Sequence, residues 1–342
     1  MNTLVAGGAG LLGAAVAKGL LAEGTDVIVA DDFGEEGDGR TVKEWRLQRL
    51  GADPRLAVER VDLADAPALA DLFGRRRPAA VVNAALFDPA GPGAGPLMFA
   101  ARSAGTGLFV HLSDGALYAP GPEPERPARE DEPLDAAGEV GLAAKLEEER
   151  LLAELGLPFV ALRVFEVLGP MFPPRRFPVV PLEAILAGEE VLYEESGWRD
   201  VVHIDDAVRG VLLSLRRRPI GKAVNLGGGL LVNPRTLLAL LAREAGRELR
   251  IRVTPPPGSL RPRRPANLER ARTELGWAPA FTVGGIVDSL VSARFGRGAG
   301  RRRPAGAAPA REPAARVREQ ARAVSRRELF GLFRRPFRGP GR

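Results

Sequence analysis

A glycine-rich turn between a short apolar run and a helical pattern constrains the fold of this chain more than any other feature. Residues 2–6 are long enough for one buried parallel strand, and residues 11–21 continue with apolar side chains at helical spacing. Three evenly spaced glycines, Gly7, Gly10 and Gly13, cover the turn between them and the start of the helical pattern. A strand, a glycine turn and a helix in this order form the setting in which a dinucleotide pyrophosphate binds at a helix N-terminus.

Each part of this turn has a separate task. Gly7 allows a tight bend, Gly10 lets backbone N–H groups approach the pyrophosphate, and Gly13 lets the helix pack closely on the sheet. Leu11 and Leu12 provide the first backbone N–H groups of the helix. We therefore predict that these five residues bind the cofactor.

The second strand, predicted over residues 26–30, ends in the pair Asp31 and Asp32. A carboxylate about 20 residues beyond the glycines suits the adenosine ribose hydroxyls of NAD and repels the additional phosphate of NADP. Arg40 lies downstream and would soften that preference. The sequence therefore predicts NAD as the cofactor.

Strands and helices alternate through the first half of the chain. Further strands are predicted over residues 56–61, 79–83, 107–112 and 159–164, with a helix over residues 142–155. Such alternation is typical of an α/β fold with a Rossmann-type, doubly wound parallel sheet.

The regular alternation of strands and helices ends after Val164, and prolines cluster at residues 170–181 and 255–265. We therefore expect a smaller C-terminal substrate-binding portion and a disordered basic tail. The expected organisation is a Rossmann domain over residues 1–165 with a later contribution around 199–229, a mainly substrate-binding portion over 166–293, and an Arg-rich tail over 294–342.

Composition excludes several kinds of site. The chain has 342 residues, no cysteine and only two histidines, His111 and His203, so neither a disulfide nor a metal site is expected. No apolar run reaches the roughly 18 residues of a membrane-spanning helix. The first predicted strand begins at residue 2, which leaves no room for a signal peptide. We therefore expect a cytoplasmic protein.

The positive charge is concentrated at the C-terminus. Residues 294–342 contain fifteen arginines and three glutamates, whereas the whole chain carries only +6, so residues 1–293 are net negative. The basic character therefore does not predict a specific nucleic-acid-binding fold. Residues 314–335 form a basic amphipathic pattern that suits an acidic protein partner or an anionic membrane surface. A solvated arginine-rich tail is the equal alternative.

Several segments together resemble the extended short-chain dehydrogenase/reductases, specifically the NAD-dependent epimerase/dehydratase family. The resemblance covers about residues 1–293 and implies a nucleotide-sugar-like substrate, a homodimer built on paired helices, and cofactor contacts from Asp62, Leu63, Asn83, Ala84, Ala85 and Lys145. The residues that carry it are Gly7 to Gly13, Asp31, Asp62-Leu63, Asn83 to Ala85, Ser113 to Tyr118, Lys145 to Glu147, Leu162-Arg163, Gly169-Pro170, Arg199 to Asp206, Asn225 to Gly229 and Glu274 to Pro279.

The catalytic segment departs from the family pattern. In such enzymes a tyrosine is the acid–base group and a lysine four residues later supports it from the same helix face. This chain has Lys145 but places Gly141 at the tyrosine position. The family's Ser/Thr position falls on Asp114, beside Ser113. Lys145 is either a retained ribose contact or a solvated lysine, and Tyr118 is either a substitute acid or a packed aromatic.

Two more positions belong to the implied substrate site. Arg199 matches the family's phosphate-binding arginine, although it has the alternative of pairing with Asp200 or Glu195. Glu166 stands where the resemblance implies an asparagine beside the substrate. His203, Asp205 and Asp206 match positions that are mostly structural in the family.

Two hypotheses follow from these substitutions. The first is an NAD-dependent epimerase/dehydratase-like oxidoreductase with a non-standard acid, for which Asp114, Tyr118 and Glu166 are the candidates. The second is a non-catalytic NAD-binding sensor or scaffold that docks through its basic tail. Loss of the acid–base group costs about 10²–10⁴-fold in rate, so activity separates the two.

Overall fold

The computed structural model describes residues 2–34, 39–87, 91, 93–119, 126–136, 138–170, 177–194, 197–255 and 263–295. Residues 1–297 form one compact unit, to which the following description applies. The predicted tail and its amphipathic segment lie almost entirely outside the described residues.

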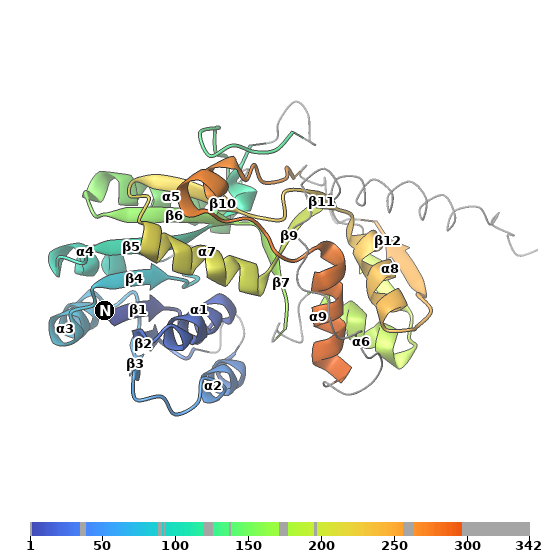
Figure 1. The fold of residues 1–342 in the computed structure, drawn as a ribbon, viewed down its shortest axis with the longest axis horizontal. Helices are drawn as coiled ribbons and strands as arrows, with labels where there is room; N and C mark the ends of the chain where they lie inside the picture. Colours follow the sequence, from blue (N-terminus) through green and yellow to red (C-terminus); the bar gives the residue numbers. More distant parts are fainter. Residues whose placement is uncertain are drawn as a thin grey trace, which may run out of the picture. The chain divides into compact units, whose positions relative to one another are not determined.

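Seven parallel strands form the central sheet, in the order β10-β6-β5-β4-β1-β2-β3 (Figure 1). This order, in which β2 and β3 extend the sheet on one side of β1 and β4, β5, β6 and β10 extend it on the other, confirms the predicted doubly wound fold. The observed ends of the predicted strands differ from the predicted ones by at most two residues, and β1 and β6 agree with the prediction at both ends. The strands are β1 (Asn2–Ala6), β2 (Asp26–Asp31), β3 (Leu56–Arg60), β4 (Ala80–Asn83), β5 (Leu108–Asp114), β6 (Phe159–Val164) and β10 (Lys222–Leu226).

Helices cover both faces of this sheet and each face has its own apolar core. On one face α1 (Leu11–Ala22) and α7 (Ile204–Arg217) lie side by side, with α2 (Arg40–Gln48) next to α1. On the other face lie α3 (Ala66–Arg76), α4 (Gly95–Ser103) and α5 (Val140–Leu155). The inner strands of the sheet are therefore held between two helical layers, as expected for a parallel sheet, whereas the edge strand β3 leaves Val58 48% exposed.

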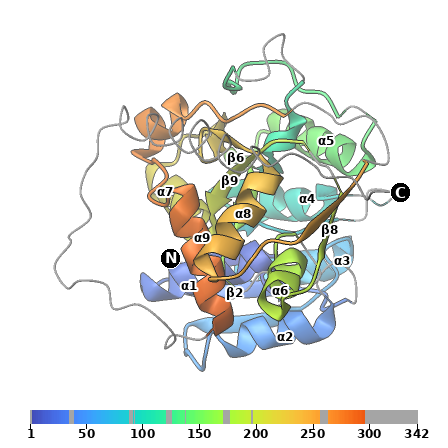
Figure 2. The same ribbon diagram turned by 90° about the vertical axis from the view of Figure 1, so that its right-hand side faces the viewer.

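The second half of the chain adds a smaller portion with a third apolar core. Figure 2 shows its helices, α6 (Val179–Ala187), α8 (Pro234–Glu244) and α9 (Val283–Phe295). Two small sheets accompany them, with strand orders β11-β9-β7 and β12-β8. Their strands are β7 (Glu166–Leu168), β8 (Val191–Glu194), β9 (Arg199–His203), β11 (Leu231–Val232) and β12 (Ile251–Thr254).

Two acidic residues connect these portions. The buried carboxylate of Asp200 accepts hydrogen bonds from the backbone N–H groups of Gly228, Gly229 and Ala266. The carboxylate of Asp206 accepts the N–H groups of Ala280 and Phe281. Both acids therefore serve the fold, because each satisfies buried backbone donors from distant segments.

His203 also has a structural position. Its Nδ1 accepts the backbone N–H of Asp205 at the start of α7, and its Nε2 lies 3.0 Å from Ser289 Oγ on α9. The ring stacks on Phe281 with 3.7 Å between centroids. His203 therefore caps one helix and holds another against it.

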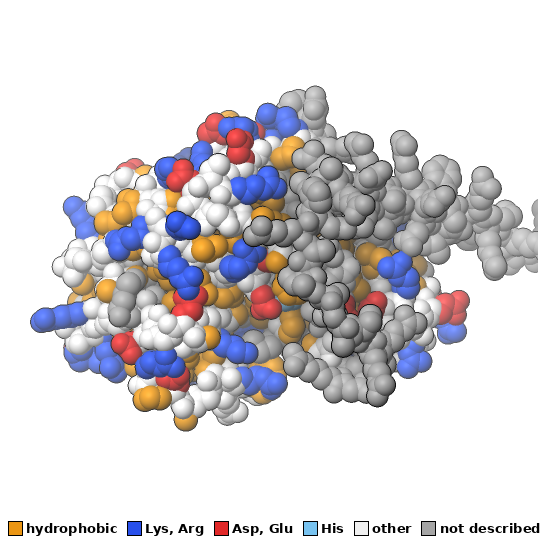
Figure 3. All heavy atoms as spheres, in the orientation of Figure 1, with side chains coloured by type: hydrophobic (Ala, Val, Ile, Leu, Met, Phe, Trp, Pro, Cys, Tyr) orange, Lys and Arg blue, Asp and Glu red, His pale blue; other side chains and the backbone are white. Residues whose placement is uncertain are grey.

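The surface of the described part mixes both charges. On the face drawn in Figure 3, Lys and Arg side chains are interspersed with Asp and Glu. Among the described residues no helix has both the length and the apolar character needed to cross a bilayer.

Candidate active site

The glycine turn between β1 and α1 is too tight for side chains. Gly7 has a φ of +67°, and a Cβ there would lie 2.6 Å from the Cα of Ala85, in the turn after β4. A Cβ on Gly13 would lie 2.1 Å from the carbonyl oxygen of Gly7. The N–H of Gly10 donates to that same carbonyl oxygen at 3.0 Å. Glycine is therefore required at these positions for the helix to begin so close to the strand.

The start of α1 retains the properties of an anion site. Gly10 is the N-cap and supplies no side-chain hydrogen bond, and the first turn contains no acidic residue. The backbone N–H groups of Leu11 and Leu12 belong to the first turn of α1, where they have no acceptor within the helix and lie at the positive end of the helix dipole. These features fit the pyrophosphate of a dinucleotide.

Asp31 lies beside this turn, at the carboxyl end of β2. Its Oδ2 accepts the N–H of Ala9 at 3.1 Å, and its Oδ1 accepts the N–H of Phe33 at 3.0 Å. Lys43 of α2 places Nζ 3.1 Å from Asp31 Oδ1 and 2.9 Å from Asp32 Oδ1. Asp31 therefore lies beside the glycine turn, and its carboxylate shares its charge with Lys43, a residue that the sequence did not single out.

Asp32 differs from Asp31 in being exposed to solvent. Although partial burial opposes the effect, the N–H of Gly34 and the ammonium of Lys43 lower the pKa of Asp32. The end of β2 therefore carries two carboxylates and one cation in close contact.

The other predicted cofactor residues follow β3 and β4 at the same edge of the sheet. Asp62 is exposed and accepts the N–H of Ala64 at 2.8 Å, while Leu63 is buried. Asn83 is fully buried and accepts the N–H of Ala85 at 3.2 Å. The fold thus brings the carboxyl ends of four neighbouring strands to one edge, where ligands of doubly wound sheets bind.

Helix α5 presents Gly141 and Lys145 near this edge. Gly141 is exposed, and a Cβ there would meet no atom of the described residues within 4 Å. Lys145 is largely buried and directs Nζ toward the carbonyl oxygen of Ala85 at 3.5 Å and toward Glu148 Oε2 at 2.9 Å. Lys145 therefore lies beside the edge of the sheet formed by the carboxyl ends of the strands, which we call the cofactor edge, rather than on a solvated helix face. Its charge partner is Glu148.

Ser113 and Tyr118 belong to a buried polar network. The Ser113 hydroxyl donates to Glu149, which pairs with Arg163 at 2.7 Å. The phenol of Tyr118 donates to Asn225 Oδ1 at 2.6 Å and accepts from Arg163 Nη1 at 2.9 Å. Burial raises the pKa of Tyr118 to about 12 despite the adjacent guanidinium. The packed-aromatic interpretation of Tyr118 is therefore the one that the contacts favour.

Asp114 has a different environment at the carboxyl end of β5. It is partly exposed, and Oδ1 accepts the N–H of Ala116 at 2.7 Å. Its Oδ2 has no hydrogen-bond partner among the described residues. Burial raises the pKa of Asp114, the N–H of Ala116 lowers it, and Arg263, Glu166 and Lys145 act on it through their charges. Asp114 is therefore a carboxyl group at the predicted site whose pKa is raised and whose Oδ2 the described residues leave without a hydrogen-bond partner.

The two predicted substrate residues contact each other. Arg199 Nη1 donates to Glu166 Oε2 at 3.0 Å, and each side chain is about one-third exposed. The guanidinium also lies over the ring of Phe177. The pairing that the sequence left open for Arg199 is thus made with Glu166, across β9 and β7.

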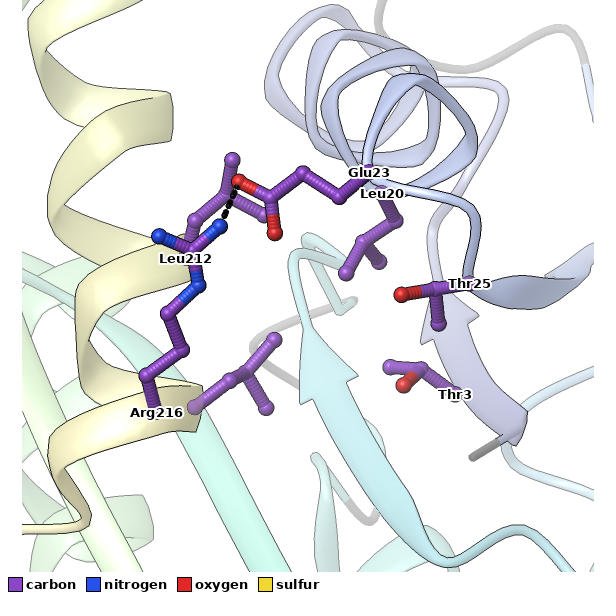
Figure 4. Close-up of a pocket in the computed structure, with 7 residues that line it drawn as sticks. Thr3, Leu20, Glu23, Thr25, Leu212 and Arg216 are labelled. Atoms are coloured by element: carbon purple, nitrogen blue, oxygen red, sulfur yellow. Dashed lines mark ion pairs between the residues drawn. The ribbon is translucent and has the colours of Figure 1, made fainter.

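A cavity of about 270 Å³ lies elsewhere, at the amino ends of the strands. Figure 4 shows Thr3 and Thr25 on one side of it and the Glu23–Arg216 ion pair on the other. This is the edge opposite the glycine turn, so the cavity is not part of the candidate site. Among the described residues, no group of His, Asp and Glu is arranged to hold a metal ion.

Comparison with known proteins gives a consistent result. The sequence model of the NAD dependent epimerase/dehydratase family matches residues 3–227. UDP-glucose 4-epimerase of Mycolicibacterium smegmatis is 31% identical over 83% of this chain and 95% of its own length. dTDP-glucose 4,6-dehydratase 1 of Escherichia coli is 25% identical over 67% of this chain and 72% of its own length.

Solved structures agree with this result. UDP-glucose 4-epimerase of Thermotoga maritima, crystallised with UDP-glucose, superposes with a TM-score of 0.76 at 25% identity, covering 86% of this chain and 99% of that one. UDP-glucose 4-epimerase of Thermus thermophilus, crystallised with NAD, gives 0.71 at 26% identity over the same shares.

Proposed function

Since this chain belongs to the NAD-dependent epimerase/dehydratase family, we propose that it is an oxidoreductase that uses NAD to oxidise a sugar carbon of a nucleotide-linked substrate. The relatives described above are named for reactions of UDP-glucose or dTDP-glucose. We propose the same two classes of nucleotide sugar as substrates of this chain.

We propose that Asp114 is the acid–base group in place of the tyrosine that Gly141 replaces. One observation carries this assignment: Asp114 Oδ2 is free of partners among the described residues, on a carboxyl group whose pKa is raised by burial. The competing candidates have their polar atoms engaged, since Tyr118 lies between Asn225 and Arg163, and Glu166 pairs with Arg199.

The proton balance of the proposed reaction is simple. On oxidation, the carboxylate of Asp114 takes the proton of the substrate hydroxyl as the carbon loses a hydride. On reduction, the protonated Asp114 returns that proton to the oxygen. When bound, NAD supplies the hydride acceptor and donor. A carboxyl group suits both directions when its pKa is raised toward the working pH.

The chain's own residues would hold the cofactor in three places. The backbone N–H groups of Leu11 and Leu12 would bind the pyrophosphate, which Gly10 lets approach closely, and Asp31 would bind the adenosine ribose. Lys145 would bind the nicotinamide ribose, which its position beside Ala85 supports. The other contacts that we propose come from Gly7, Gly13, Asp32, Asp62, Leu63, Asn83, Ala84 and Ala85.

We further propose a homodimer that forms through α4 and α5. Phe99 of α4 is 52% exposed and Val140 of α5 is 66% exposed, although both are apolar. Two adjacent helices with exposed apolar side chains suit a self-complementary interface. Sedimentation of the wild type should give twice the monomer mass, and Phe99→Ser should shift it toward the monomer.

The non-catalytic alternative has its own support. Gly141 removes the usual acid, and Glu166 places a negative charge against Arg199, where a phosphate would otherwise bind. In that case the chain would bind NAD and dock through residues 294–342. A chain that ends at Arg297 should then keep its melting transition and NAD affinity while losing attraction to anionic vesicles or an acidic partner.

Incubating the protein with NAD and with UDP-glucose or dTDP-glucose distinguishes the enzyme hypothesis from the sensor hypothesis. The enzyme hypothesis predicts a changed sugar, separated by chromatography, with no net consumption of NAD. Stoichiometric NAD binding by calorimetry without any sugar product across a panel of nucleotide sugars would favour the sensor.

A further inference from the structure

A buried polar cluster lies beneath the candidate site and takes no part in the proton transfer proposed above. It consists of Lys145 and Glu148 on α5, His111 on β5 and Asn83 at the end of β4. Glu148 Oε2 lies 2.9 Å from Lys145 Nζ, and Glu148 Oε1 accepts the N–H of Ala94 at 3.1 Å. The Glu148 side chain is only 6% exposed, so this is a buried ion pair with a fixed geometry.

The hydrogen bonds fix the protonation of His111. The side-chain oxygen of Asn83 accepts the N–H of Ala85, so its Nδ2 is the atom that donates to His111 Nδ1 at 3.1 Å. His111 therefore carries its proton on Nε2, which faces Glu148 Oε2 at 3.4 Å. Burial, and then the charge of Lys145, hold the pKa of His111 well below its ordinary value. The imidazole is thus neutral, and Lys145 is the cation that compensates Glu148.

If Glu148 were absent, Lys145 would be well placed to interact with a phenol at position 141. An ammonium group one helical turn from a phenol stabilises the phenolate, because the opposite charge favours the ionised form. Residues 141 and 145 share one face of α5, and the space around Gly141 is open. Glu148 approaches the same ammonium from the other side, at position i+3.

We propose that Glu148 has replaced the missing phenol as the charge partner of Lys145, so that this lysine still serves the cofactor edge but no longer activates a group at position 141. Glu148 is in this sense a positioning residue: it holds Lys145 and cancels its field. The inference rests on the proposed function only in placing Lys145 at the cofactor edge. Restoring a tyrosine at position 141 would then not suffice to restore its usual chemistry, because Glu148 would have to change as well.

The test is the titration of a phenol introduced by Gly141→Tyr, followed by ultraviolet difference spectroscopy without substrate or cofactor. The parent protein, which contains Tyr118 and Tyr193, provides the spectrum to subtract. We expect the introduced phenol to titrate at or above about 10, the ordinary tyrosine value. A midpoint about one pH unit or more below that value would overturn the proposal, because Lys145 would then be free to act on the phenol.

A second variant tests the role of Glu148 directly. Adding Glu148→Gln to Gly141→Tyr should lower the midpoint of the introduced phenol by about one pH unit, a tenfold change in its ionisation constant. The same midpoint in both variants would refute the proposal. Glu147→Gln is the matched control, because Glu147 is the sequence neighbour, is 65% exposed and pairs with Arg150, and it should leave the midpoint unchanged.

These outcomes are separate from those of the proposed function. The titration needs neither turnover nor NAD, so an inactive protein can still support the inference, and an active one can still contradict it. Where Glu148→Gln leaves too little folded protein, as removal of one partner of a buried ion pair can, the midpoint of the single variant Gly141→Tyr still decides the matter. Circular dichroism of each variant establishes that the titrated protein is folded.

Discussion

Arg199 Nη1 lies 3.0 Å from Glu166 Oε2, so the two residues that the sequence assigns to the substrate site neutralise each other. A diphosphate that binds Arg199 must displace this carboxylate or tolerate its charge. We predict that Glu166→Asn raises the affinity for UDP by about three- to tenfold, since the exposed pair itself is worth only about 0.2–1 kcal/mol and the remainder comes from lost repulsion.

Calorimetry with UDP measures this effect. Glu183→Gln is the control, because Glu183 of α6 pairs with Arg294 of α9 at 3.3 Å and its side chain is 49% exposed. Unchanged or weaker UDP binding by Glu166→Asn would show that Glu166 does not oppose the phosphate.

Lys43 is expected to set how strongly the chain discriminates between NAD and NADP. The wild type should prefer NAD, because the carboxylate of Asp31 would repel the additional phosphate of NADP. Lys43→Met should widen the preference, since an additional phosphate would then meet Asp31 and Asp32 without the compensating ammonium. Dissociation constants for both cofactors give the ratio, with the distant Lys18→Met as the control. If the dissociation constant for NADP divided by that for NAD were smaller in Lys43→Met than in the wild type, this role of Lys43 would be contradicted.

Gly13 is predicted to tolerate no side chain. Gly13→Ala would place Cβ 2.1 Å from the Gly7 carbonyl oxygen, so it should abolish NAD binding and lower the melting temperature. Gly74→Ala on α3 is the matched control, because a Cβ there meets nothing within 4 Å. That change should stabilise the protein by about 0.5–1 kcal/mol, as alanine does in a helix relative to glycine. Retained NAD affinity in Gly13→Ala would refute the cofactor turn.

The ionisation of Asp114 predicts two opposite pH trends. As a base it must be ionised, so the oxidation rate should rise with pH through its raised pKa, above the ordinary value of about 3.9. The folded state keeps this proton to higher pH than the unfolded state does, so the free energy of unfolding should fall over the same window. Denaturant melts and rates measured across this range should both lose the trend in Asp114→Asn. A trend that persists in that variant would assign it to another group.

The sequence was sufficient for the central sheet because its signals are local. The glycine turn, the strand at residues 26–30 and the helix near Lys145 each depend on neighbouring residues, and the structure places them within one or two residues of the predicted ends. Gly13 is an example in which the turn itself requires the residue.

Contacts between distant segments were not predictable. Asn83 meets His111 and Glu148 meets Ala94 only because β4, β5, α4 and α5 pack together. Tyr118 remained ambiguous in the sequence for the same reason, since its partners Arg163 and Asn225 lie 45 and 107 residues away. Which charged and polar groups of the site pair with one another could therefore be learned only from the structure.

The most direct test of the central claim is the rate of hydride transfer in Asp114→Asn compared with the wild type. The two proteins should be compared at equal NAD saturation with the best nucleotide sugar of the panel, by following the absorbance of the reduced nicotinamide in a single turnover. Our account predicts a loss of about 10²–10⁴-fold in the rate with NAD affinity unchanged, as expected for removal of the acid–base group. A variant that transfers hydride as fast as the wild type would contradict the assignment of Asp114.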